Sequence, residues 1–296
     1  MEELTLQLRR TAKEILEKGE AQLVIGWEKG AFWYSSTPAF ISKPEDTERL
    51  IWDEYCVHNL AKYLLDYRHK EGKTAVFVKG CDARALNVLL QDKQLIREKI
   101  LIIGLACPGM KDEAEARKLG QDASIPLYKK CRECRYPNAI NYDLFIGEDK
   151  VIKEVPAQED FSEVQALESL SPDEKYNKFA ANYDRCLRCY ACRNICPACN
   201  CRECIFDQTA AGWSAKANNV SENMFFALTR ALHVAGRCVG CGECERACPV
   251  NIPIMLLNKK IIQDINGLFG EYEAGTDVTA KLPLGGFEFT DPEEFM

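Results

Sequence analysis

The sequence predicts two domains, an α/β domain in the first half of the chain and a mainly helical, cysteine-rich domain in the second half. The length of 296 residues corresponds to about two domains. Short apolar runs alternate with helical patterns up to about residue 150, and 11 of the 16 cysteines lie beyond residue 180. Hydrophobic residues make up 47% of the chain and charged residues 28%, which is typical of a globular protein.

Three short apolar runs with β-branched residues predict strands buried on both faces, at residues 22–27, 74–78 and 100–105. A fourth strand is expected at residues 144–147. Since helical patterns separate these runs, the alternation favours a mostly parallel sheet. We expect helices at residues 1–20, 48–67, 82–90 and 112–119, the third with Asp82 as its N-cap.

The second half begins after an acidic and polar stretch that we interpret as a linker containing a helix. We therefore place the α/β domain at residues 1–160, the linker at 161–180, the cysteine-rich domain at 181–270 and an irregular tail at 271–296. One strong helix is expected at residues 221–235, capped by Ser221. Its apolar stripe is interpreted as ordinary core packing and consists of Met224, Phe225, Leu228, Ala231 and Leu232.

Charge and hydropathy argue against several classes of protein. The net charge is −7, and a nucleic-acid-binding protein would need a basic face. The longest apolar stretch, residues 100–107, is much shorter than the ~20 residues that cross a membrane. The N-terminal segment lacks the apolar core of a signal peptide. We therefore expect no nucleic-acid partner, no membrane span and a cytoplasmic location, where clustered thiols serve metals or redox chemistry.

Two cysteine runs with identical spacing dominate the second half. Each reads C-x2-C-x2-C-x3-C-P, the spacing of two-cluster bacterial ferredoxins, in which the last cysteine of each run binds the other cluster. Isolated C-x2-C pairs are more often zinc sites, but two complete runs with trailing prolines are not a zinc pattern. One 4Fe–4S cluster is predicted on Cys186, Cys189, Cys192 and Cys248. The other is predicted on Cys238, Cys241, Cys244 and Cys196.

The segment between the two runs contains a full helix, unlike the shorter connection of minimal ferredoxins. In this respect the second half resembles the α-helical ferredoxin domains of heterodisulfide reductase and fumarate reductase subunits. Basic residues flank the cluster loops and would offset the negative charge of clusters and thiolates: Arg185, Arg188, Arg193, Arg202, Arg237 and Arg246.

A third group of cysteines lies in the α/β half. Cys81 and Cys107 each follow a predicted strand, and the carboxyl ends of strands are where α/β sheets build their sites. A thiolate at Cys81 would also gain from the start of the next helix. Cys131 and Cys134 supply a C-x2-C pair on a loop. The spacing alone leaves open a shared metal site, or two buried free thiols beside a zinc pair.

Four segments carry a resemblance to a known family: VKGCDARAL, IGLACPGM, CRECRYPN and DLFIGE. They resemble the beta subunits of coenzyme F420-reducing hydrogenase and F420-dependent formate dehydrogenase over roughly residues 70–150. In that family the matching cysteines bind one 4Fe–4S cluster beside an FAD. The resemblance therefore implies a third cluster on Cys81, Cys107, Cys131 and Cys134. The two ferredoxin runs match the family's companion module, although here they lie on the C-terminal side.

The same resemblance raises the question of a flavin. The family's glycine-pair segment before the flavin-binding helix is missing, and no G-x-G-x-x-G occurs, so FAD bound by this chain or by a neighbouring subunit both stay open. Asp82 and Arg84 are candidate neighbours of a flavin or cluster. The alternative for these two residues is a helix N-cap and a surface ion pair.

Four cysteines remain after these assignments: Cys56, Cys199, Cys201 and Cys204. The last three form C-x-C-x2-C directly after the first run, a density that indicates binding of a fourth cluster or a zinc ion. Cys56 or a residue outside the chain would be the fourth ligand. For Cys56 the alternative is a buried free thiol.

These features together predict an iron–sulfur electron-transfer subunit of an anaerobic oxidoreductase complex. The expected partners are heterodisulfide-reductase-like, hydrogenase or formate dehydrogenase subunits. One alternative is a flavin-containing subunit that itself oxidises or reduces coenzyme F420 or a similar two-electron carrier. Another is a non-redox, zinc-bound assembly scaffold. No nucleophile elbow, P-loop or zinc-protease motif occurs, so we predict no catalytic side chain.

Overall fold

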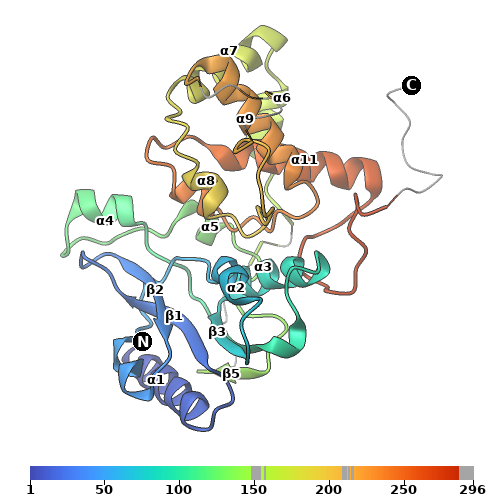
Figure 1. Cartoon of the computed structure of the whole chain (residues 1–296). Helices are drawn as coiled ribbons and strands as arrows, with labels where there is room; N and C mark the ends of the chain where they lie inside the picture. The colour runs from blue at the N-terminus through green and yellow to red at the C-terminus, as the bar shows by residue number, and fades with distance from the viewer. Residues whose placement is uncertain (148–154, 157, 209–211, 213, 215–216, 287–296) are drawn as a thin grey trace. The chain divides into compact units, whose positions relative to one another are not determined.

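The computed structural model describes residues 1–147, 155–156, 158–208, 212, 214 and 217–286. The chain divides into two compact units, Met1–Glu159 and Asp160–Met296, and each is described by itself (Figure 1). No helix in the described ranges has the length and apolar character needed to cross a membrane.

The first unit is built on a five-stranded sheet with the order β2-β1-β3-β4-β5. The predicted strands are confirmed as β1 (Leu23–Lys29), β3 (Thr74–Val78), β4 (Ile100–Leu105) and β5 (Leu144–Ile146), and they are parallel to one another. The sequence reading missed β2 (Ser36–Ile41), which pairs antiparallel with β1. This strand contains Pro38, a residue that sheets tolerate mainly at an edge, where β2 lies.

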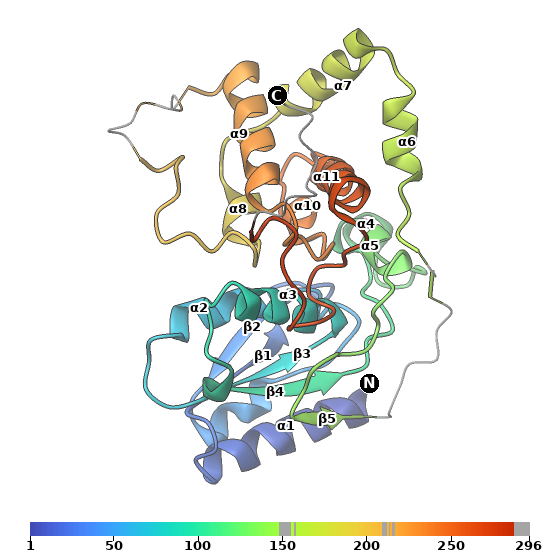
Figure 2. The ribbon, with the colours of Figure 1, turned by 90° about the vertical axis from the view of Figure 1, so that its right-hand side faces the viewer.

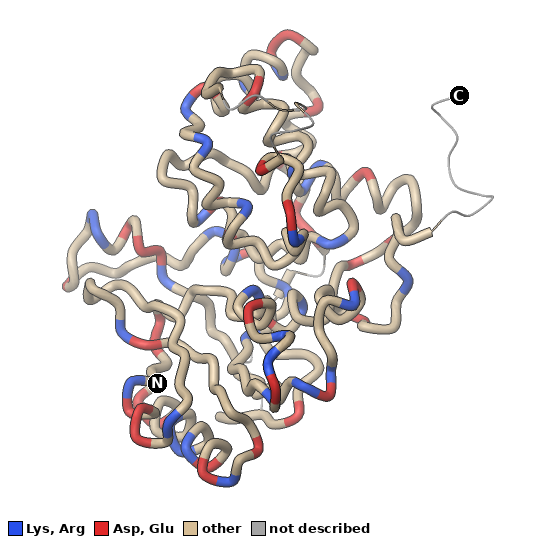
Figure 3. The backbone as a smooth tube through the Cα atoms, in the orientation of Figure 1, with Lys and Arg blue, Asp and Glu red and all other residues tan. Residues whose placement is uncertain are grey.

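Helices cover both faces of this sheet. The amphipathic helix α1 (Glu2–Glu17) lies on one face and α3 (Gly80–Gln91) on the other (Figure 2). Basic and acidic residues are interspersed along α1, as its solvated outer face requires (Figure 3). Helix α4 (Glu113–Leu119) is capped by Asp112, whose side chain accepts hydrogen bonds from two backbone N–H groups.

The predicted helix over residues 48–67 is wrong. The segment instead forms the 3-10 turns η1 (Pro44–Arg49) and η2 (Ala61–Tyr63) and the short helix α2 (Leu64–Tyr67), separated by irregular backbone. The carboxylate of Asp53 accepts the N–H of Tyr55 at 2.8 Å, and the Asn59 amide oxygen accepts the N–H of Ala61 at 3.1 Å. Such side-chain-to-backbone bonds compete with helix formation, although most of the apolar residues of the pattern are buried: Leu50, Cys56, Leu60 and Leu64.

Helix α3 also begins differently from the prediction. Its N-cap is Lys79, and Asp82 occupies the third helical position, where it accepts the backbone N–H of Lys79 at 2.9 Å. Asp82 further accepts the N–H of Leu60 at 2.6 Å and forms an ion pair of 3.0 Å with the Lys79 ammonium. Both side chains are buried, so this ion pair ties the start of α3 to the segment before α2.

In the described part of the second unit, every assigned element is a helix. These are α6 (Ser162–Glu168), α7 (Pro172–Asp184), α8 (Ala191–Asn194), α9 (Val220–His233), α10 (Glu243–Arg246) and α11 (Ile254–Phe269). The predicted linker forms α6 and the first part of α7. Val164 of α6 is fully buried, and Glu168 pairs with Lys260 of α11 at 2.5 Å. The segment expected to be a linker is therefore packed into this unit.

The prediction for α9 needs two corrections. Its N-cap is Asn219 rather than Ser221. Three members of the predicted core stripe are exposed: Phe225 by 41%, Leu228 by 46% and Leu232 by 54%. The buried face instead carries the polar Asn223 and Arg230 beside Phe226, Ala227 and Ala231. The two polar side chains donate hydrogen bonds to backbone carbonyls in or near the first cysteine run. These bonds hold the face with Asn223 and Arg230 against the rest of the unit, so most of the apolar stripe faces solvent.

The described part of the tail is irregular, as predicted, yet it is anchored at several points. Ala274 is buried, and Pro283 lies against Gly236, where a Cβ atom would be 3.5 Å from the proline ring. The last ten residues of the predicted tail lie outside the described residues.

The Asp82→Ala variant tests the buried ion pair of the first unit. We expect the free energy of unfolding to fall by about 3–5 kcal/mol, because the Lys79 ammonium would stay buried without its partner. Urea unfolding of the full chain, followed by the fluorescence of Trp27 and Trp52, measures the change. Asp122 is exposed, so Asp122→Ala should shift the curve by less than about 0.5 kcal/mol. Equal effects of the two substitutions would contradict the assignment.

Candidate metal centres

The two cysteine runs fold into the same loop twice. The residues on either side of the second cysteine of each run have left-handed backbone. In the first run φ is 52° at Arg188 and 58° at Tyr190, and in the second run it is 67° at Gly240 and 66° at Gly242. A short helix follows in both cases, α8 in the first run and α10 in the second. The G-C-G of the second run was a signal of this conformation that the sequence reading did not use.

This loop conformation is suited to an anionic group. Alternating right- and left-handed residues direct successive backbone N–H groups to one side, which forms the anion-binding concavity found at many iron–sulfur sites. The N–H of Arg188 approaches the Cys186 sulfur at 3.4 Å, and the N–H of Ile252 approaches the Cys248 sulfur at 3.4 Å. The backbone of both runs therefore fits a cluster of negatively charged sulfurs.

The first run adopts this shape without glycine. A left-handed residue with a side chain costs about 1–2 kcal/mol, so Arg188 and Tyr190 need compensating contacts. The Arg188 guanidinium is buried, donates to the Glu222 carbonyl at 2.7 Å and lies 5.4 Å from the ring centroid of Phe226. The Tyr190 ring packs edge-on against the same phenylalanine at 5.2 Å. These contacts hold the loop in its strained form.

One pocket of the second unit contains all four thiols of the first predicted set. Cys186, Cys189 and Cys192 line it together with Cys248, which comes from the second run. Including its open part, the pocket encloses about 530 Å³, and most of its lining is apolar. Burial raises the pKa of Cys186, and it raises that of Cys192 to about 11. The thiolates thus need a positive partner here, which iron atoms would supply.

The thiols of the second predicted set are also neighbours. Burial raises the pKa of Cys244 well above its ordinary value, and the nearby Cys196, Cys238 and Cys241 add to this effect. The Asn258 amide points at two of these sulfurs, 3.7 Å from Cys238 and 3.9 Å from Cys244. The structure therefore places the last cysteine of each run beside the first three cysteines of the other.

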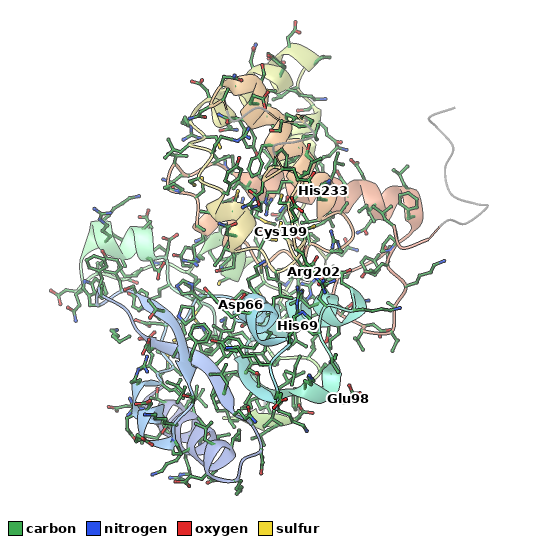
Figure 4. The ribbon with its side chains drawn as sticks, in the orientation of Figure 1. Asp66, His69, Glu98, Cys199, Arg202 and His233 are labelled. Atoms are coloured by element: carbon green, nitrogen blue, oxygen red, sulfur yellow. The ribbon has the colours of Figure 1, made fainter. Side chains whose placement is uncertain are left out.

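The remaining cysteines of the second unit, Cys199, Cys201 and Cys204, differ in their surroundings. A hydrogen bond from Cys199 lowers the pKa of Cys196 to about 5, so these two thiols are in contact (Figure 4 labels Cys199 and, further along the same segment, Arg202). Cys201 is exposed, and Cys204 accepts a hydrogen bond from Arg193. Among the described residues, no three His, Cys, Asp or Glu side chains converge on a point for a single ion. A cubane does not require such convergence, since each thiolate binds a different iron.

Cys56 is a buried thiol of the first unit. Its sulfur accepts the N–H of Asp53 at 3.3 Å and lies 3.8 Å from the Ile51 carbonyl. Burial raises the pKa of this thiol. These local bonds are those of an ordinary buried cysteine.

The third predicted set lies at the carboxyl edge of the parallel sheet. Cys81 sits in the first turn of α3, directly after β3, and Cys107 follows β4. The N–H of Cys107 donates to the Pro137 carbonyl at 2.8 Å, which fixes the loop after Cys134 beside it. This loop passes so close to Gly80 that a Cβ atom there would be 1.9 Å from the Tyr136 carbonyl oxygen. Only glycine fits at this position.

The charges around this set explain how it could hold thiolates. Burial raises the pKa of Cys107 to about 12, the nearby Cys131 and Cys134 add to the rise, and Lys79 opposes it. Burial also raises the pKa of Cys81, and the positive charge of Lys79 again opposes the rise. Burial alone would lower the pKa of Lys79, but Asp82 and the two thiols raise it, so the ammonium stays charged. Lys79 is therefore a buried positive charge at this site, and the sequence reading missed it.

The contacts of Asp82 and Arg84 are structural. The Asp82 carboxylate is engaged by Leu60 and Lys79, and the Arg84 guanidinium lies 4.4 Å from the centroid of the Tyr136 ring. Arg84 thereby holds the loop that carries Cys134 against α3. A role of these two residues in binding a flavin stays a prediction.

The Gly80→Ala variant tests the third site. The added methyl group would displace the loop that follows Cys134, so we expect the purified chain to lose about four irons while the others remain. Iron counting under anaerobic conditions measures the loss. Gly267 in α11 has open space around it, and Gly267→Ala should keep the full iron content. Unchanged iron in Gly80→Ala would show that the loop does not hold a cluster.

Comparison with known proteins agrees with the two cysteine runs of the second unit. Residues 182–252 match the 4Fe-4S dicluster domain family, a range that contains both runs. The chain is 23% identical to the F420-dependent formate dehydrogenase subunit beta of Methanocaldococcus jannaschii, over 90% of each chain. It is 24% identical to F420-dependent formate dehydrogenase 1 subunit beta of Methanococcus maripaludis, over 93% of this chain and 91% of the relative. The chain is therefore similar over nine-tenths of its length to beta subunits of F420-dependent formate dehydrogenase and carries a 4Fe-4S dicluster domain, which together support an iron–sulfur electron-transfer subunit of an oxidoreductase.

Proposed function

We propose that this chain relays single electrons through three 4Fe–4S clusters within an oxidoreductase complex of the formate dehydrogenase type. The observation that carries the proposal is the pocket in which Cys248 joins Cys186, Cys189 and Cys192. Cys248 is 56 or more residues away from the other three thiols in the sequence. It joins them in the crosswise order that two-cluster ferredoxins use. Coverage of nine-tenths of the beta-subunit relatives supports the type of complex.

The proposed ligand sets follow the geometry. Cys186, Cys189, Cys192 and Cys248 hold the first cluster, and Cys238, Cys241, Cys244 and Cys196 hold the second. Cys81, Cys107, Cys131 and Cys134 hold the third, in the α/β unit. Each cluster accepts one electron and releases it to the next carrier, and the protein sets its potential through burial, hydrogen bonds and nearby charge.

The two units would have different roles in electron transfer. The α/β unit presents the third cluster near a flavin held by this chain or by a neighbouring subunit, and the mainly helical module exchanges electrons with a partner subunit. Formate dehydrogenase, hydrogenase or heterodisulfide-reductase-like subunits are partners of the required kind. The names of the relatives favour formate dehydrogenase.

A second candidate function is favoured by one feature of the relatives, the dependence on F420 in both of their names. A flavin bound to this chain would convert the two-electron chemistry of such a carrier into the single-electron steps of the clusters. This candidate requires a flavin on this chain, whereas the relay alone does not.

The crosswise ligand sets predict a specific pattern in paired substitutions. Cys189→Ser and Cys248→Ser should each remove about four irons, and the double variant should remove no more, because both residues serve one cluster. Cys189→Ser combined with Cys241→Ser should remove about eight. Anaerobic iron and sulfide analysis measures the losses. Additive loss in the Cys189–Cys248 pair would show that each run binds its own cluster.

Metal and flavin counting separates the candidate functions. The relay predicts about 12 irons per chain, and a fourth cluster on the Cys199, Cys201 and Cys204 group would raise this to about 16. About 12 irons with one zinc would place zinc at that group. One flavin per chain, together with activity toward coenzyme F420, would favour the second function. A colourless chain with zinc and no iron would contradict both and support a scaffold.

A further inference from the structure

Arg230 lies on the buried face of α9 and is 4% exposed. It lines the pocket that contains Cys186, Cys189, Cys192 and Cys248, and its Nη2 donates to the Cys192 carbonyl at 3.3 Å. The Nε group is also buried, and among the described residues it has no hydrogen-bond partner. A guanidinium is rarely buried in this way unless a negative group lies close to it.

The negative groups around Arg230 come from both cluster sites. Cys192 belongs to the first proposed ligand set, while Cys244 and Cys196 belong to the second. Ala227, almost one turn before Arg230 on α9, packs in one buried cluster with Cys244 and Cys192. Val234, about one turn after Arg230, packs in a buried cluster with Cys196. An arginine guanidinium is not deprotonated in proteins, so this charge is permanent.

We propose that Arg230 is a positioning residue shared by the two cluster sites of the second unit, and that its fixed charge raises the reduction potential of both. The inference rests on the proposed function. A 4Fe–4S cluster gains one negative charge when it accepts an electron from a redox partner. A buried positive charge therefore stabilises the reduced cluster more than the oxidised one, and the effect is strong because few waters screen it.

Exposed arginines near the same loops cannot have this effect to the same degree. Arg185 lies directly before Cys186 but is exposed, and it bonds the Val250 carbonyl at 3.1 Å. Water and salt screen such a charge. Arg185 is therefore a matched control of the same residue type, next to the same run.

The experiment compares Arg230→Met, Arg230→Lys and Arg185→Gln in the full chain, prepared under anaerobic conditions. Iron is counted first, and redox titration monitored by electron paramagnetic resonance then gives the potential of each cluster. In Arg230→Met, with iron retained, both clusters of the second unit should shift to lower potential. Arg230→Lys keeps a charge and should shift them less, and Arg185→Gln should leave all potentials near those of the unaltered chain.

Several results would overturn the inference. Unchanged potentials in Arg230→Met, or a shift of only one of the two clusters, would show that the charge is not shared. Loss of iron in Arg230→Met with retention in Arg230→Lys would show that Arg230 serves assembly rather than potential. Fewer than about eight irons in the second unit of the unaltered chain would instead refute the proposed function itself.

Discussion

Buried sulfur next to buried positive charge is the interaction around which both units of the chain are organised. Burial raises the pKa of at least one thiol at each proposed cluster site, that of Cys107 to about 12, that of Cys192 to about 11 and that of Cys244 well above its ordinary value. Such thiols are held as thiolates only beside positive groups. Lys79 supplies such a charge in the α/β unit and Arg230 supplies it in the helical unit. The clusters would add the remaining positive charge through their irons. This requirement explains why two cationic side chains are buried where apolar ones would be expected.

The crosswise arrangement of the two runs makes the second unit interdependent. The last cysteine of each run lies beside the other loop, so in the proposed ligand sets each cluster takes thiols from both runs. Helix α9 carries residues that connect the two sets: Arg230 bonds the carbonyl of Cys192, and Ala227 packs in one buried cluster with Cys192 and Cys244. Cluster binding in this unit is therefore coupled to its folding, as in other small metal-binding domains.

Much of the fold was predictable because local patterns and tertiary structure agree. The strands β3 and β4 were predicted to the residue, since fully buried parallel strands are continuous apolar runs with distinct ends. The failures have physical causes. Residues 48–67 have a helical apolar pattern, but the side chains of Asp53 and Asn59 accept backbone N–H groups and prevent a continuous helix. The edge strand β2 was missed because it contains Pro38, which is unfavourable in most strands. The apolar stripe predicted the wrong buried face of α9, because hydrogen bonds from Asn223 and Arg230 to the first cysteine run bury the neighbouring polar face instead.

Three features of this protein can be read directly from its sequence: the number and spacing of the thiols, the alternation of strands and helices, and the family resemblance that the relatives bear out. Ligand spacing is local, so it can be read along the chain. Which charges are buried beside the thiols depends on long-range contacts and is visible only in the folded protein. Lys79 and Arg230 look like ordinary surface residues in the sequence, and their role depends on the low dielectric that folding creates around them. The close approach of the Cys131–Cys134 loop to Gly80 is likewise a long-range contact, which no local pattern encodes.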